Sequence, residues 1–443
     1  MLNEQDFRKI EKQAIGLYQN LELQIIEEIA TRIARVGYAN TVVLNDIQIA
    51  QEMGLLYQDV ILMVAKYNNT TYEKVAEIFS EAGATTLKFD DEIYTEAGLN
   101  PLPINQSSGM VQLLNSTIAK TAGNLQNLVM TTANTAQTQF YNAMNKAYME
   151  VSTGVKSYSQ SILEAIDEVS SQGAVITYPS GRSMNIESAV RMNVVTGVNQ
   201  TCGKLQELRA DELGWDLMEL TAHAGARPSH AEWQGKIVSR SGKNKKYLNL
   251  SDIGYGEVTG FKGVNCGHDW YPYFEGSART YTQEQLDTWK NEKVTYNGKK
   301  YSKYEATQIQ RKIERQIRAD KKELAGLQGI LTSANDNKLI EDTRTEFGRR
   351  SLIYKTHQNE LDDFIEQTSF AKDNTRLYVG KQDKNISTQV ANVTKIANKY
   401  NNSNIVGSKV NGIEITAIGE HIISRTYARN IRVNCKSKIQ KKK

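Results

Sequence analysis

The sequence has few of the residues that interrupt helices or cross-link chains. Only five prolines occur among 443 residues. Proline breaks helix interiors, so the long proline-free stretches indicate a largely helical protein. The three cysteines, Cys202, Cys266 and Cys435, are widely separated and odd in number. They exclude a disulfide framework and are typical of a protein in a reducing cytosol.

Long apolar runs and a strong charge of one sign are also missing. No run of about eighteen apolar residues is present, which excludes a membrane-spanning helix and a membrane partner. The polar start "MLNEQDFRKIEKQ" does not resemble a secretory signal. The net charge of +4 is mild and is concentrated in the last residues, "CKSKIQKKK". The body of the chain therefore offers no domain-wide surface for nucleic acid, and we expect a soluble protein with two or three cores.

The pattern of apolar residues predicts a mainly α protein with a central α+β domain. We expect a helical region at 1–170, a compact α+β domain at 171–280, a charged helical arm at 281–370 and a small α+β appendage at 371–443. Within them, helices are expected at 6–36, 44–53, 55–67, 71–94, 186–201, 203–213, 282–292, 303–331, 342–367 and 419–430, with two long helices within 110–170. Strands are expected at 174–178, within 216–223 and 235–241, in a hairpin around Asn297–Gly298, and at 413–418.

Two helical stretches lack an obvious core of their own. The segment "TTANTAQTQ" is polar almost all round, and such helices usually pack against a neighbour or a partner chain. In the arm, isoleucines and leucines form a narrow apolar stripe, whereas the Arg and Lys residues of "QRKIERQIRADKK" are expected to face solvent.

Histidine and cysteine gather in the central domain, in "TAHAGARPSHAEWQGK" and "GVNCGHDWYPYF". Because zinc takes about four Cys or His ligands, His223, His230, Cys266 and His268 are candidate metal ligands. No Cys-x-x-Cys pair supports this assignment, and polar core and turn contacts are the alternative. Cys266 with His223 or His230 could also form a nucleophile and base pair.

A second candidate site lies near the end of the chain, in "GEHIISRTYARNI". His421, Arg425 and Arg429 recur at four-residue steps and would share one helix face. A metal-free ribonuclease uses such a face, with His as the acid or base and Arg to neutralise the phosphoryl oxygens. The alternative is a solvated basic face.

Three ordered motifs, "ARPSHAEWQGKIVSRSG", "GVNCGHDWYPYFEGSAR" and "TYNGKKYSKYEATQIQRKIERQIRADKKE", resemble the phage minor capsid protein 2 family. Their central part is similar to the head-morphogenesis domain of Mu-type phages. The matching signature residues are Arg227, Pro228, Ser229, His230, Trp233, Gln234, Gly235, Asn265, Cys266, His268, Trp270 and Pro272.

The resemblance implies a non-enzymatic structural protein of the virion head, assembled in the cytoplasm of a bacterial host. Its expected partners are portal and capsid proteins, with genomic DNA involved indirectly. It implies no cofactor and no small-molecule substrate, and zinc enters only through the Cys and His candidates. The residues around His421 are similar to small toxin-type ribonucleases, without the final strand of those domains. An effector carried by the head is therefore the alternative function.

Overall fold

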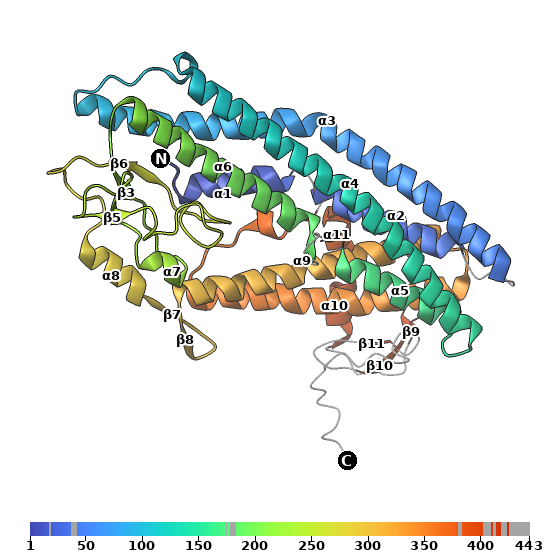
Figure 1. The fold of residues 1–443 in the computed structure, drawn as a ribbon. Helices are drawn as coiled ribbons and strands as arrows, with labels where there is room; N and C mark the ends of the chain where they lie inside the picture. The colour runs from blue at the N-terminus through green and yellow to red at the C-terminus, as the bar shows by residue number, and fades with distance from the viewer. Residues whose placement is uncertain are drawn as a thin grey trace. The chain divides into compact units, whose positions relative to one another are not determined.

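The computed structural model describes residues 1–16, 19–36, 42–173, 175–177, 183–379, 383–401, 409–410, 413–417 and 423–424. Most of these residues are helical, and the strands form small sheets (Figure 1). The predicted fold class, mainly α with small α+β parts, is confirmed. Among the described residues, no helix combines the length and apolar character needed to cross a bilayer.

The bounds of the elements follow in chain order. The helices are α1 (Glu4–Gly16), α2 (Gln19–Val36), α3 (Val42–Glu96), α4 (Ser108–Ser152), α5 (Tyr158–Gln172), α6 (Ile186–Glu212), α7 (Pro228–Ala231), α8 (Gln283–Asn291), α9 (Lys303–Ser333), α10 (Asn337–Thr368) and α11 (Asp383–Asn401). The strands are β1 (Val175–Thr177), β2 (Ser183–Asn185), β3 (Leu217–Leu220), β4 (Ile237–Ser239), β5 (Leu248–Asn249), β6 (Trp270–Pro272), β7 (Lys293–Tyr296), β8 (Lys299–Ser302), β9 (Lys409–Val410), β10 (Ile413–Ala417) and β11 (Ile423–Ser424).

Several predicted helix boundaries are wrong. The three helices expected between residues 44 and 94 form one helix, α3, and the two expected between residues 186 and 213 form α6. Thr71, at the start of the helix expected at 71–94, is a residue type that often caps helices, but it is buried inside α3. A capping preference is worth only about 1 kcal/mol, so the packing of a long helix overrides it. The helix expected at 6–36 is described as α1 and α2, on either side of residues 17–18.

Two polar stretches contribute to the core: "TTANTAQTQ", which was expected to pack against a neighbour or a partner chain, and part of the Arg and Lys run of α9, which was expected to face solvent. In "TTANTAQTQ" of α4, Thr132, Ala133 and Ala136 are buried on one helix face. In α9, Lys322 is buried and its Nζ lies 2.6 Å from Oε1 of Glu22. Small side chains allow close helix packing, and a buried carboxylate compensates a buried lysine. Neither effect shows in a pattern that separates only apolar from polar residues.

The C-terminal strands correct another prediction. Strand β10 confirms the expected β-branched run, and β9 and β11 pair with it on either side in antiparallel fashion. Ile423–Ser424 pairs with Ile415 and Ala417 as β11, in the middle of the helix expected at 419–430. The helix prediction is therefore wrong at these two residues. Helix α11, which precedes the sheet, was not predicted.

The chain divides into two compact units, and each is assembled from separate stretches of sequence. Unit 1 comprises residues 1–18, 65–129 and 186–309, and unit 2 comprises residues 19–64, 130–185 and 310–443. Three of the five boundaries between them fall inside helices, namely α3, α4 and α9.

In unit 1, a four-stranded sheet packs beside helix α6. Its strand order is β5-β4-β3-β6, and the central strand β3 is antiparallel to both β4 and β6. Helix α6 contacts β6 and also packs along α1 (Figure 1). The core of this region is apolar and rich in aromatic residues: Met218, Leu220, Trp233, Val238, Ile253, Phe261, Cys266 and Trp270. The predicted hairpin is confirmed, since Asn297 and Gly298 join β7 to β8 with φ of 49° and 74°.

Helices α3 and α6 of unit 1 also bury charged groups. Arg209 is fully buried and pairs with Asp91 at 2.7 Å and with Glu212 at 2.8 Å. Next to Asp91 in α3, Asp90 accepts a hydrogen bond of 3.0 Å from Nε2 of Gln206, which lies one turn before Arg209 in α6. Burial raises the pKa of Asp90 to about 8, against the effect of the Met1 amino group 3.8 Å away. Asp90 is therefore largely protonated at neutral pH.

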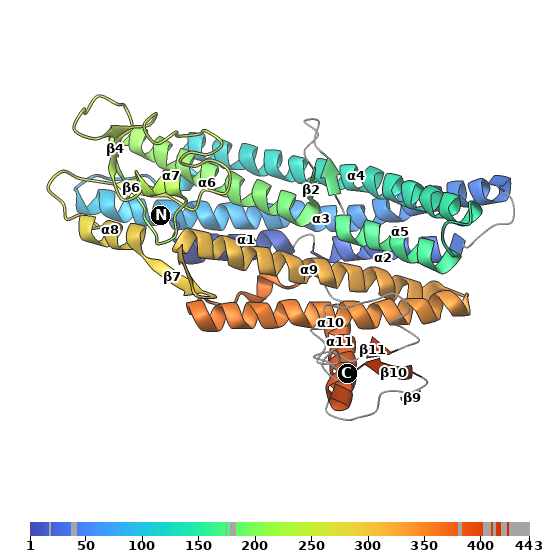
Figure 2. The ribbon, with the colours of Figure 1, turned by 90° about the horizontal axis from the view of Figure 1, so that it is seen from below.

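Unit 2 is built mainly from helices, with α9 and α10 running side by side (Figure 2). Arg350 of α10 forms ion pairs with Glu323 of α9 and with Asp167 of α5. Gly329 of α9 allows close contact with α2, because a Cβ at this position would lie 3.0 Å from the Cβ of Ala30. The apolar stripe predicted on α9 is largely buried, since Ile313, Ile317, Leu324 and Leu327 all belong to the core.

Candidate functional site

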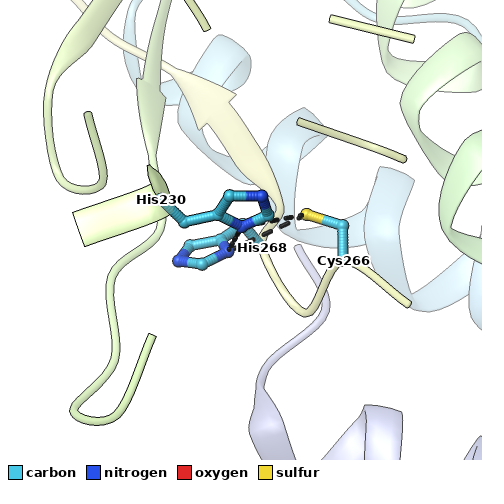
Figure 3. Close-up of side chains that lie close together, drawn as sticks. All are labelled: His230, Cys266 and His268. Atoms are coloured by element: carbon cyan, nitrogen blue, oxygen red, sulfur yellow. Dashed lines mark hydrogen bonds between the residues drawn. The ribbon is translucent and has the colours of Figure 1, made fainter. Parts of the chain in front are cut away.

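Two histidines and one cysteine converge inside unit 1 (Figure 3). Nδ1 of His230 lies 3.3 Å from Nδ1 of His268, and Sγ of Cys266 lies 4.0 Å and 3.8 Å from these two nitrogens. All three side chains are 1% exposed. We call His230, Cys266 and His268 the His–Cys cluster.

Two short segments bring these side chains together. His230 lies in α7, a helical turn that begins with Pro228, a residue suited to the first position of a helix. Cys266 and His268 lie just before β6, after Asn265, which has a φ of 53°. A guanidinium nitrogen of Arg227 donates to the carbonyl oxygen of Val264 at 3.1 Å and so ties the two segments to each other.

The outer nitrogens of both imidazole rings have defined partners. Nε2 of His230 lies 2.8 Å from the carbonyl oxygen of Thr259, and Nε2 of His268 lies 3.1 Å from Oε1 of Gln234. That same Oε1 accepts the backbone N–H of His223 at 3.1 Å. Because both partner atoms are oxygen acceptors, each Nε2 carries the ring proton. Each Nδ1 then presents a lone pair to the centre of the cluster.

A buried polar network holds the Cys266–Asp269 segment against α6. Nδ2 of Asn199 donates to the carbonyl oxygens of Cys266 at 2.8 Å and of His268 at 3.3 Å. Nζ of Lys262 donates to Oδ1 of Asn199 at 2.8 Å and to Oδ1 of Asp269 at 2.6 Å. The second carboxylate oxygen of Asp269 accepts the backbone N–H of Leu2 at 2.6 Å. The cluster therefore rests on a network that also includes the start of the chain.

Burial controls the protonation of the cluster. Burial lowers the pKa of His230 to about 4 and lowers the pKa of His268 well below its ordinary value. The nearby Arg227 and His223 lower both pKa values further. Burial also raises the pKa of the Cys266 thiol. A nucleophilic cysteine needs an accessible thiolate, and Cys266 has neither the exposure nor the lowered pKa. The arrangement suits a metal ligand set better than a nucleophile with its base.

Three of the four candidate metal ligands meet in the cluster. The ring of the fourth, His223, lies over that of His268 with their centroids 4.5 Å apart, but it is not one of the converging ligands. Among the described residues, no other group of three or more potential ligands gathers in this way. His421, Arg425 and Arg429 lie outside the described residues.

Most of the other signature residues surround the cluster. Trp233 and Trp270 belong to the core, and Gln234 connects His223 with His268. Gly235 has a φ of 69°, and a Cβ there would lie only 3.0 Å from Leu286 of α8. Trp233, Gln234 and Trp270 thus take part in the packing and hydrogen bonding around the cluster.

Sequence reasoning did not identify the supporting residues Asn199, Thr259 and Lys262. Asn199 lies in a long helix whose sequence gives no signal for a polar contact, and Thr259 contributes only its backbone oxygen. Lys262 precedes Asp269 by seven residues in a loop, where no regular spacing relates a lysine to its partner. A pattern of residue types cannot reveal such contacts.

Comparisons with known proteins agree with the motifs. Residues 2–366 match the family model described as phage minor capsid protein 2. A structural protein of Lactococcus phage LL-H is 28% identical over 281 residues, which cover 60% of this chain and 73% of the relative. A structural protein of Lactococcus phage mv4 is 37% identical over 75 residues, which cover 17% of this chain and 53% of that relative. No solved structure matches the chain. Since the family model covers most of its length, the chain belongs to the phage minor capsid protein 2 family.

Proposed function

We propose that the protein is a minor component of the phage head that acts at the portal vertex or on the inner face of the capsid. There it would serve head assembly, genome packaging or genome ejection, with portal and capsid proteins as its direct partners. The observation that carries the proposal is the family match over residues 2–366. Two relatives whose names describe them as structural proteins of phages support it.

The surface of unit 2 offers additional support. Large apolar side chains are exposed within its long helices, among them Leu62 of α3 at 67% and Met149 of α4 at 64%. Single exposed apolar residues are common on protein surfaces, and the packed core of an interface buries such side chains. We therefore expect unit 2 to supply part of the surface that binds the head.

Mass spectrometry of purified virions tests the proposal. We expect the protein in mature particles, in far fewer copies than the major capsid protein. Cryo-electron microscopy of particles with and without the protein should place the difference density at the portal vertex or inside the shell. Absence from particles, together with normal heads after deletion of the gene, would contradict the proposal.

Incorporation of variants tests the role of unit 2. In a phage deleted for the gene, we expect Leu62→Asp and Met149→Asp to reduce the amount of protein in particles. Both side chains are exposed, so the substitutions should leave the fold intact. Val258→Asp is the matched control, because Val258 is 71% exposed but lies in unit 1. Equal incorporation of all three variants and the unchanged protein would exclude these positions from the contact surface.

A further inference from the structure

We propose that the His–Cys cluster binds one zinc ion, with Nδ1 of His230, Nδ1 of His268 and Sγ of Cys266 as its ligands. The ion would join α7 to the segment before β6 and hold this part of unit 1 together. The inference is independent of where the protein lies in the virion.

The distances between the ligand atoms match a tetrahedral zinc site. Zinc–nitrogen bonds of about 2.0–2.1 Å and zinc–sulfur bonds of about 2.3 Å place two nitrogens about 3.4 Å apart and a nitrogen and a sulfur about 3.6 Å apart. The structure has 3.3 Å between the nitrogens, and 3.8 Å and 4.0 Å between the nitrogens and the sulfur. Small side-chain movements would therefore complete the coordination.

The hydrogen bonds of the two imidazole rings also favour a cation between the two Nδ1 atoms. Both Nε2–H groups are engaged by Thr259 and Gln234, so two lone pairs face each other across 3.3 Å in a buried space. The Cys266 thiol has one proton and can donate to only one of them. A metal ion accepts both lone pairs and the thiolate at once. Histidine ligands in metal sites characteristically donate their other N–H to an oxygen, as both do here.

The ligand types favour zinc over the hard cations. Two imidazoles and a thiolate suit zinc, whereas calcium and magnesium prefer oxygen ligands. Among the described residues no fourth Cys, His, Asp or Glu joins the cluster. We therefore assign the fourth position to water or a small ligand. The full burial of the three side chains indicates a role in stability.

Metal analysis of the purified full-length protein tests the assignment. After expression with zinc and gel filtration, we expect about one equivalent of zinc per chain. His230→Gln, Cys266→Ser and His268→Gln should each lose most of it. Two matched controls should retain it: Cys202→Ser, because Cys202 is buried in α6 outside the cluster, and His223→Gln, because the His223 ring lies beside His268 without joining the three converging ligand atoms.

Cobalt substitution keeps the assignment testable if a ligand variant folds poorly. The wild-type protein, stripped with a chelator and reloaded with Co²⁺, should show a thiolate-to-cobalt charge-transfer band. Cys202→Ser should show the same band, and Cys266→Ser should not. Less than half an equivalent of zinc with no cobalt band in the wild type would overturn the proposal, as would full zinc content in Cys266→Ser. Loss of zinc from His223→Gln would overturn the three-ligand assignment.

Discussion

Removal of the lysine beneath the cluster should destabilise unit 1 strongly. In Lys262→Met most of the aliphatic packing remains, but the fully buried Asp269 keeps its charge and loses its ammonium partner 2.6 Å away. Removing one partner of a buried ion pair costs about 3–5 kcal/mol. Asn199 also loses the N–H donor to its Oδ1. We therefore expect Lys262→Met to lower the free energy of unfolding of unit 1 by an amount at the upper end of this range.

Tryptophan fluorescence can follow this unit separately during denaturation by urea. All four tryptophans lie in unit 1: Trp215, Trp233, Trp270 and Trp289. The double variant Lys262→Met with Asp269→Asn should lose less stability than the sum of the single variants, by about 1–3 kcal/mol, because the uncompensated charge is gone. Lys246→Met is the control, since Lys246 pairs with Glu275 on the surface.

Two results would refute this reasoning. One is a loss below about 1 kcal/mol for Lys262→Met, the size of effect seen for exposed ion pairs. The other is strict additivity of the two substitutions, which would show that the charges do not stabilise each other in the folded state. Lys246→Met should change the free energy of unfolding by less than about 1 kcal/mol, as expected for an exposed ion pair.

The remaining predictions concern pH and helix packing. The folded pKa of Asp90, about 8, lies above the unfolded value of 3.8, so the free energy of unfolding of the wild type should fall as the pH rises from about 4 to about 8. In urea titrations, Asp90→Asn should match the wild type near pH 4 and be more stable than the wild type above pH 8. The hydrogen bond to Asp320 raises the pKa of His357, so His357→Gln should be destabilising below about pH 6.5 and progressively less so as the pH rises through the folded pKa. A loss of unfolding free energy that stays constant with pH in urea titrations would contradict this prediction. Gly329→Val should lower unit 2 stability by about 1–3 kcal/mol through overpacking. Gly348→Val in α10 is its control, because a Cβ at Gly348 meets nothing within 4 Å; equal circular-dichroism melting points for the two variants would exclude overpacking.

The sequence predicted element types better than element boundaries. Apolar periodicity and the Asn-Gly turn led to the correct helices and hairpin in α9, α10 and β7–β8, because local patterns determine them. The false break before residue 71 in α3 arose from Thr71, whose local preference for a helix start gave way to packing.

The sequence pointed to the three side chains that converge in the His–Cys cluster, but not to their surroundings. The Cys-x-His motif and His230 were recognisable because few residue types bind metals. Which histidine stays outside the cluster depends on the path of a loop, and sequence spacing does not describe that path. His223 and His230 looked equivalent in sequence, and only the structure separates them.

The discontinuous make-up of unit 1 has a consequence for folding during synthesis. Leu2 is hydrogen-bonded to Asp269, 267 residues further along the chain. At about 5–20 residues per second, a ribosome needs on the order of ten to fifty seconds to make that interval. During this interval α1 has been synthesised, but its partner α6 and the strand β6 are not yet complete. Helix α1 thus leaves the ribosome well before the segments that cover it, and its apolar face is open to other nascent chains and chaperones in the meantime.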